Sequence, residues 1–149
     1  MYPILCLAAL IVATAGPLLG QASGAPRLLS PAETGCDTSR RIVPDSVYES
    51  DTVDEPVAAV RLPIEDMPLR IREVLSGRSV FRFVVEPSGR IDRCSIELIE
   101  ENAPEWTAAV LRELRQARYR PARLNGRQVW QRVYQIFTYS QDGRFLQGR

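Results

Sequence analysis

Side chains that commonly perform catalysis are scarce in this sequence. The chain has no histidine, which removes the most common general base and the commonest metal ligand. Its cysteines form no Cys-x-x-Cys pair, so zinc-ribbon and thioredoxin-like sites lack their ligands. A pair of carboxylates could supply an acid and a base, and the candidates are Asp92, Glu97, Glu100 and Glu101. The plainer interpretation is that they lie at a solvated strand end and loop. We predict that the chain is not an enzyme and uses no metal or cofactor.

The basic side chains are all arginine, and their total of 19 nearly equals the 18 acidic side chains. This balance argues against nucleic acid as the main partner. Guanidinium groups bind carboxylates and phosphates bidentately, although a compositional bias of the genome is the plainer reason for the lack of lysine. One basic cluster consists of Arg112, Arg115, Arg118, Arg120, Arg123 and Arg127. It predicts either an anion-binding patch or, more simply, a solvated face.

The N-terminal residues 1–24 have the character of a secretory signal. An uncharged apolar segment is followed by small residues, and it is too short for a comfortable membrane span. Cleavage is expected either after Ala15 or between Ala22 and Ala25, and Gly16-Pro17 favours the later position. The segment has only the terminal amine as a positive charge, so an uncleaved membrane anchor is the alternative.

Three cysteines occur in the chain, and the first of them, Cys6, would leave with the signal. Cys36 and Cys94 would then remain in an oxidising compartment, where a disulfide between them is the natural hypothesis. In the alternative, Cys94 is a buried apolar residue in line with Ile96 and Leu98, and Cys36 is a free thiol.

Residues 25–54 are rich in Ser, Thr, Asp, Pro and Gly and show no sustained period, which predicts a flexible linker. A short extended segment is expected over residues 57–62. Asp66 and Pro68 have the types that begin a helix, and Gly77 has the type that ends one. A second helix is expected to start at Pro104, because apolar residues then recur with helical spacing: Trp106, Val110, Leu114 and Ala117.

Alternating apolar residues predict three strands. The first two form a hairpin, in which residues 81–85 and 94–98 flank the turn Pro87-Ser88-Gly89. The third covers residues 128–140 after the turn signal Asn125-Gly126. Large apolar side chains occupy both faces of this last strand. Trp130 and Tyr134 therefore either form an exposed patch or cover the reverse of the sheet by pairing with Arg82 and Arg93.

These elements predict an α+β fold in which a small three-stranded antiparallel sheet packs against two short helices. At least one strand edge would remain unpaired. An extended peptide can add to such an edge through main-chain hydrogen bonds, while alternate side chains give selectivity. The sequence therefore points to a binding module.

Residues 53–139 resemble the C-terminal domain of the TonB family. Residues 81–91 (FRFVVEPSGRI) resemble the first strand, glycine turn and following hydrophobic position of the family, and residues 106–114 resemble its amphipathic helix. Residues 119–129 (YRPARLNGRQV), with Val133 and Phe137 beyond them, resemble the aromatic-x-Pro-Ala motif and alternating strand at the family's end. On this basis we expect residues 55–143 to form a TonB C-terminal-like domain and residues 144–149 a tail.

The resemblance implies a periplasmic module, associated with transmembrane transport, that binds an outer-membrane receptor or another envelope protein. Its last strand would pair with a short extended segment of that partner, through Gln131, Val133, Gln135 and Phe137. Some members of the family form homodimers by exchanging strands, and the same edge would serve both purposes.

This chain departs from full energy transducers of the family in two ways. It lacks the histidine of their membrane anchor, and its linker is shorter than their proline-rich spacer. The resemblance therefore favours partner binding over energy coupling. The alternative is a free-standing structural or assembly protein of the cell envelope that uses the same fold for self-association.

Overall fold

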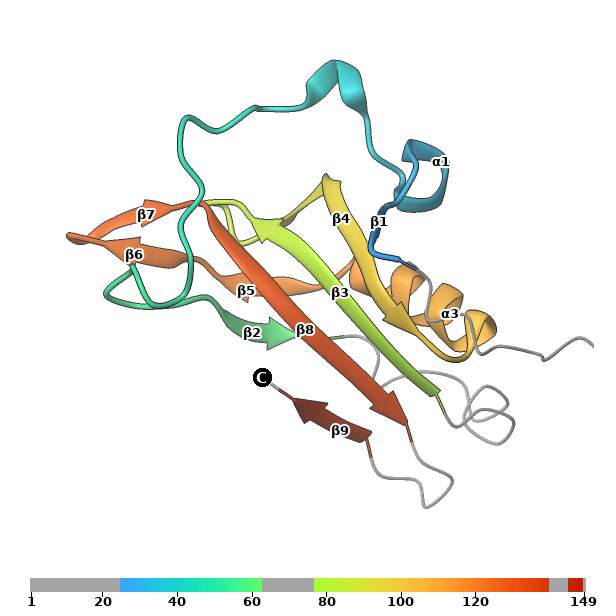
Figure 1. Ribbon diagram of the computed structural model, residues 1–149. Helices are drawn as coiled ribbons and strands as arrows, with labels where there is room; N and C mark the ends of the chain where they lie inside the picture. The colour runs from blue at the N-terminus through green and yellow to red at the C-terminus, as the bar shows by residue number, and fades with distance from the viewer. Residues whose placement is uncertain (1–24, 63–76, 140–144, 149) are drawn as a thin grey trace, which may run out of the picture.

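The computed structural model describes residues 25–62, 77–139 and 145–148, and Figure 1 shows their arrangement. The described elements are, in chain order, β1 (Arg27–Leu28), α1 (Pro31–Thr34), the 3-10 helix η1 (Thr38–Arg40), β2 (Ala58–Arg61), β3 (Gly77–Val85), β4 (Ile91–Glu101), α3 (Pro104–Leu114), β5 (Arg118–Arg120), β6 (Ala122–Leu124), β7 (Arg127–Val129), β8 (Gln131–Tyr139) and β9 (Phe145–Gly148). Among the described helices, none has the length and apolar character that a membrane crossing requires.

The main sheet has five strands in the order β1-β4-β3-β8-β9, and every neighbouring pair is antiparallel. Two further ribbons, β2-β5 and β6-β7, have two strands each. The predicted fold of a three-stranded sheet against two short helices is therefore wrong. The three expected strands are the central β4, β3 and β8, and short strands on both sides extend them (Figure 1). The helix expected over residues 66–76 lies outside the described residues.

The β3–β4 hairpin forms as the alternation of its residues predicts. Phe81, Phe83 and Val85 are buried on one side of β3. The turn closes when the amide of Gly89 donates to the carbonyl of Glu86, at 2.9 Å. Gly89 has a φ of 77°, which glycine adopts without strain.

Helix α3 covers the buried side of this hairpin. Pro104 occupies its first turn, where a proline costs no hydrogen bond. Its apolar stripe includes Trp106, Val110 and Leu114, all of which are almost fully buried. The ring of Trp106 lies directly over Gly77 at the start of β3, where an added Cβ would be 2.6 Å from the ring. Helix α3 therefore packs so closely on the start of β3 that no side chain fits at position 77.

The hydrophobic core lies between the sheet and α3. Phe81 of β3 and Phe137 of β8 contact edge to face, with ring centroids 6.0 Å apart. Phe83 contacts Tyr119 of β5 at 5.8 Å, so the β2-β5 ribbon also faces this core. Aromatic pairs with these geometries add to the stabilisation that burial provides.

Parts of residues 25–54, for which composition predicts a linker, pair with the main sheet. β1 pairs with β4, and the amide of Leu29 donates to the carbonyl of Ile96 at 3.0 Å. Leu29 is 4% exposed and belongs to the core. Cys36 is joined to Cys94 of β4 by the disulfide that the cysteine count leads one to expect, with Cα atoms 5.0 Å apart. We refer to residues 25–36 as the arm.

The last expected strand is divided. Asn125 and Gly126 both have positive φ, and they form the tight turn of the separate β6–β7 hairpin. β8 begins after Trp130 and pairs with β3 along its whole length, from Gln131 to Tyr139. Residues 145–148 fall in the expected tail, and they form β9 on the outer side of β8.

Candidate functional site

The outer edge of β8 is covered only in parts. Near its start, the amide of Tyr48 donates to the carbonyl of Trp130 at 2.9 Å, and the amide of Arg132 donates to the carbonyl of Tyr48 at 2.8 Å. Arg132 therefore directs its backbone groups away from β3. In an antiparallel strand every second residue does the same, so the next residue to do so is Tyr134.

β9 covers the other end of this edge. Its pairing with β8 runs from Ile136, opposite Gly148, to Tyr139, opposite Phe145. Tyr134 lies between the Tyr48 contact and β9. Within the described part of the chain, its N–H and C=O groups face outward without a strand partner.

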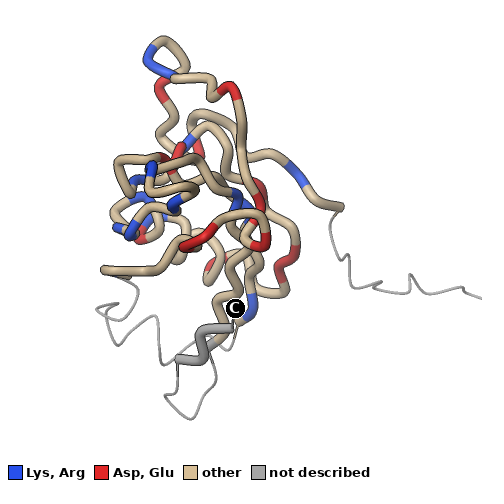
Figure 2. Tube along the Cα trace, turned by 90° about the vertical axis from the view of Figure 1, so that its left-hand side faces the viewer, with Lys and Arg blue, Asp and Glu red and all other residues tan. Residues whose placement is uncertain are grey.

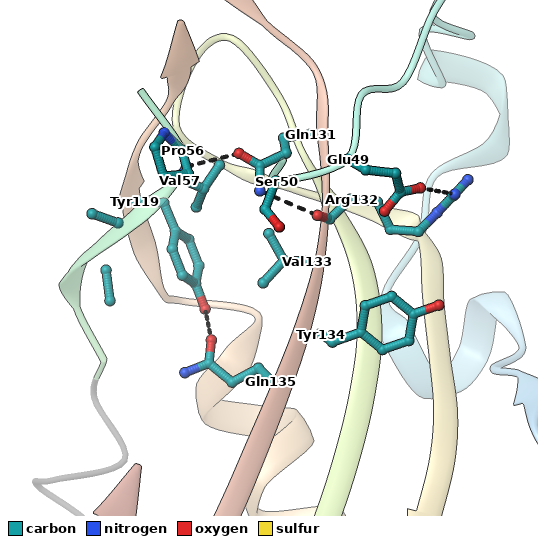
Figure 3. A pocket seen from close by; sticks show the side chains of 12 residues that line it. Glu49, Ser50, Pro56, Val57, Tyr119, Gln131, Arg132, Val133, Tyr134 and Gln135 are labelled. Atoms are coloured by element: carbon teal, nitrogen blue, oxygen red, sulfur yellow. Dashed lines mark hydrogen bonds and ion pairs between the residues drawn. The ribbon is translucent and has the colours of Figure 1, made fainter. Parts of the chain in front are cut away.

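A cavity of about 700 Å³ lies beside this gap, and Figure 3 shows its lining. The lining residues come from the segment before β2, from β2 and β5, and from β8: Glu49, Ser50, Pro56, Val57, Ala58, Ala59, Tyr119, Gln131, Arg132, Val133, Tyr134 and Gln135. The cavity thus separates the outer edge of β8 from β2.

The β2 side of the cavity also presents backbone groups. The amide of Val57 donates to Oε1 of Gln131 at 2.8 Å, so it points toward β8. By strand alternation, the backbone groups of Ala59 point the same way. β2 pairs with β5 on its other side. Two strand edges, at Ala59 and Tyr134, therefore face the cavity from opposite sides.

The interior of the cavity carries neutral polar groups. Gln131 and Gln135 are only 3% and 5% exposed. The hydroxyl of Tyr119 donates to Oε1 of Gln135 at 3.0 Å, and burial raises the pKa of this phenol, which therefore stays protonated. Nε2 of Gln131 donates to the carbonyl of Arg132 at 3.3 Å. The side-chain amide N–H groups of Gln135 have no acceptor among the described residues, so they remain available to a ligand.

The outer rim of the cavity is formed by Tyr134, whose side chain is 53% exposed. Nη1 of Arg82 donates to the Tyr134 hydroxyl at 3.0 Å, and its guanidinium lies 5.7 Å from the ring centroid. Arg82 also forms an ion pair with Glu97. Hydrogen bonds to Glu97 first, and then to Tyr134, raise the pKa of the Arg82 guanidinium. Tyr134 therefore pairs across strands with Arg82 and still presents about half its surface to solvent.

The structure brings together three of the four predicted partner-binding residues. Gln131, Val133 and Gln135 line the cavity, whereas Phe137 lies in the hydrophobic core and is fully buried. Sequence reasoning missed Tyr48, Val57 and Tyr119 as parts of the site. The buried position of Tyr119 between exposed Arg118 and Arg120 is a period-two signal that marks a short strand.

Three of the four carboxylates considered for acid–base chemistry have structural partners. Oδ1 of Asp92 accepts the amide of Cys94 at 2.9 Å. Glu97 and Glu100 form ion pairs with Arg82 and Arg78. In residues 25–62, 77–139 and 145–148, no cluster of three or more Cys, Asp or Glu side chains is placed to hold a metal ion. The cavity lining offers hydrogen bonds and apolar contacts to a ligand.

Comparisons with known proteins give no match, either to a protein-family model or to a curated protein sequence.

Proposed function

We propose that this protein is a secreted binding module that captures a short extended segment of an envelope partner by strand addition to β8. The observation that carries the proposal is the unpaired edge at Tyr134, which opens on a cavity that β2 bounds on its other side. Unpaired strand edges bind extended peptides through main-chain hydrogen bonds.

The geometry limits the segment that can bind. The uncovered part of β8 lies between Arg132, which Tyr48 contacts, and Ile136, which pairs with β9. Four residue steps of a strand span about 13 Å, so the segment would make strand contacts over three or four residues. Its main chain would bond Tyr134 on one side and Ala59 on the other.

Alternate side chains of the segment would meet different surroundings. One set would enter the cavity, where the free amide of Gln135 offers a donor beside apolar Val133 and Val57. The other set would lie against the exposed ring of Tyr134. A segment with a hydrogen-bond acceptor at its inward position would fit this lining best.

The resemblance to the TonB C-terminal domain supplies the class of partner. It favours a periplasmic protein that binds an outer-membrane transporter, with residues 1–24 as its export signal. The disulfide between Cys36 and Cys94 agrees with an oxidising compartment. The resemblance and the uncovered edge together support a role associated with transmembrane transport.

A second candidate function is self-association as an assembly protein of the envelope. β9 pairs with β8 on one side, and its other side has no partner among the described strands. A second copy could pair with that side, as edge strands commonly do. Light scattering coupled to gel filtration distinguishes this candidate, since it requires a dimer in the absence of peptide.

Tyr134→Pro tests the proposal, because it removes the outward N–H and leaves the hydrogen bonds between β8 and β3 in place. The matched control, Tyr134→Val, removes the ring and keeps the N–H. Binding of synthetic peptides with the extended segments of outer-membrane transporters is measured by fluorescence anisotropy. We expect Tyr134→Pro to weaken binding about tenfold more than Tyr134→Val does. Equal binding by the two variants would exclude strand addition at this edge.

A further inference from the structure

The described arginines divide into two groups by their partners. Seven of them form ion pairs with carboxylates, and these lie on the arm, at the end of η1, on α3 and on the strands of the main sheet: Arg27, Arg40, Arg41, Arg78, Arg82, Arg112 and Arg132. The other described arginines have no carboxylate of the described residues within 4.0 Å: Arg61, Arg90, Arg93, Arg115, Arg118, Arg120, Arg123 and Arg127. In Figure 2 several basic positions gather at the left of the tube, while others lie apart from them.

Part of the unpaired group has structural roles. Nη1 atoms of Arg115 and Arg93 lie close to Gly35, the C-cap of α1, and Arg93 also donates to the carbonyl of Arg115. Arg123 lies on the β6–β7 hairpin, and its backbone pairs with that of acidic Glu55. Nη1 of Arg123 donates to the carbonyl of Gly126 at 3.1 Å, so these three side chains have neighbours in the local structure of α1 and of the β6–β7 turn.

Three of the five remaining arginines lie on the β2-β5 ribbon, whereas Arg127 lies on β7 and Arg90 in the β3–β4 turn. Arg118 and Arg120 are exposed on either side of buried Tyr119, so both project from the solvent side of the ribbon. Arg61 of β2 is the direct cross-strand partner of Arg118. Arg118 donates to the carbonyls of Gln116 and Ala117, which leaves its charge unneutralised.

The β3–β4 turn adds a fourth arginine to this side. The amide of Tyr119 donates to the carbonyl of Gly89 at 2.9 Å, and an added Cβ at Gly89 would lie 2.2 Å from the carbonyl oxygen of Tyr119. The turn is therefore in contact with β5 and holds Arg90, which is exposed, beside the ribbon. We call Arg61, Arg90, Arg118 and Arg120 the arginine face.

This arrangement opposes the stability of the ribbon. Like charges directly opposite each other on paired strands are destabilising, and Arg61 faces Arg118 in that way. A chain whose formal charge is only +1 has carboxylates enough to pair these groups. Their concentration without counter-charges makes the surface complementary to an anion.

We infer that the arginine face binds an acidic extended segment of a partner protein. Arg118 and Arg120 are two residues apart on one strand, which is the spacing of alternate side chains along an extended chain. Guanidinium groups bind carboxylates bidentately, so a segment with acidic residues at alternate positions matches this register. Mobile lipid headgroups would need no such register. β2 also bounds the cavity beside β8, so one partner can reach both surfaces.

The test uses the full chain and a labelled peptide in which Glu and Thr alternate, with a Gln-Thr peptide as the neutral probe. The variant Arg61→Gln/Arg118→Gln/Arg120→Gln is compared with Arg27→Gln/Arg40→Gln/Arg112→Gln, which removes the same charge at ion-paired sites. We expect the first variant to weaken anisotropy-measured binding of the acidic peptide about tenfold, and the second by less than about twofold. Circular dichroism checks that both variants fold.

The other outcomes overturn the inference. Equal weakening by the two variants would mean that net charge alone attracts the peptide, and equal binding of the neutral peptide would remove the role of charge. Binding to phosphatidylglycerol vesicles that is lost in the first variant, without binding of the acidic peptide, would make the face a membrane contact. None of these results depends on the β8 edge, so the Tyr134 variants test the proposed function separately.

Discussion

The two edges of the main sheet, beside β4 and beside β8, are covered in different ways. On the β4 side, the arm adds a strand, buries Leu29 in the core and is joined to β4 by the Cys36–Cys94 disulfide. On the β8 side, the cover consists of one contact at Tyr48 and a short β9, with a cavity between them.

The difference shows how one small sheet can be both stable and open. Strand edges that carry unpaired N–H and C=O groups invite pairing with other chains. Here the β4 side is closed by a covalent bond and by apolar burial. The backbone groups at Tyr134 form an uncovered edge that opens on the cavity, and the outer side of β9 likewise has no partner among the described strands.

Loss of the disulfide is expected to give the largest effect. A bond across a sequence separation of 58 residues stabilises a fold by about 4 kcal/mol through loop entropy. We expect Cys36→Ser/Cys94→Ser to lower the free energy of unfolding by up to that amount in urea titrations. The parent chain unfolded in the presence of a reductant is the control and should lose a similar amount of stability. If the double variant is as stable as the parent chain, the disulfide does not stabilise the β4 edge.

Truncation of Leu29 tests whether the arm belongs to the core. Leu29 is 4% exposed, whereas its neighbour Leu28 is 62% exposed. Leu29→Ala should cost about 3 kcal/mol of unfolding free energy, and Leu28→Ala less than about 0.5 kcal/mol. Both are measured by urea denaturation. Similar losses of unfolding free energy in the two variants would show that Leu29 is not part of the hydrophobic core.

The cavity side should respond more weakly to loss of a buried hydrogen bond. Tyr119→Phe removes the donor to Gln135 and would cost about 2 kcal/mol at a dry site. Because water can enter the cavity and bond Gln135, we expect about 1 kcal/mol in thermal or urea unfolding. The control Tyr134→Phe removes an exposed hydroxyl. If Tyr119→Phe instead lowers the unfolding free energy by about 2 kcal/mol, water does not enter the cavity. That result would contradict the contrast between the two edges.

The smallest effect concerns the capping box of the arm. The backbone amide of Ser30 and then its hydroxyl hold the pKa of Glu33 below its ordinary value of 4.5. A lowered folded-state pKa contributes stability above the unfolded pKa, and this is lost as pH falls through the folded pKa. The stability difference between the parent chain and Glu33→Gln should therefore shrink below pH 4.5.

Arg27→Gln is the control for this pH dependence. Arg27 lowers the pKa of Glu33 less than Ser30 does, since its ion pair is exposed and the Ser30 bonds remain without it. The variant should keep most of the pH dependence. A full loss in Arg27→Gln would place the effect in the ion pair and not in the cap.

The sequence predicts the central elements because each carries its own periodic pattern. Phe81 and Phe83 alternate with Arg82 along β3, and Trp106 and Val110 repeat along α3. The disulfide partners followed from counting cysteines. Such signals are local, and tertiary packing agrees with them in these segments.

The sheet's outer strands carry no comparable signal. β1 has two residues and pairs with β4 across a long sequence separation, for example Arg27 with Leu98. Strands this short show no period, so composition alone made residues 25–54 a linker. One local signal was present: Ser30 and Glu33 have the spacing of a capping box, which the structure forms.

The side chains of the candidate site could be predicted only in part. Alternation along β8 places Gln131, Val133 and Gln135 on one face, and all three line the cavity. It also places Phe137 there, and only the tertiary contact with Phe81 reveals that this ring is in the core. The gap at Tyr134 depends on where Tyr48 and β9 pair, and strand pairing over such distances has no local code.

The close approach at Gly89 and Gly77 provides a criterion for recognising relatives. At Gly89 a side chain would meet the carbonyl of Tyr119, and at Gly77 it would meet the ring of Trp106. Most surface positions can diverge freely, whereas these two tolerate no larger residue without a shift of the backbone. A distant homologue should therefore keep both glycines at this spacing, with an aromatic residue at the position of Trp106, even when little other identity remains.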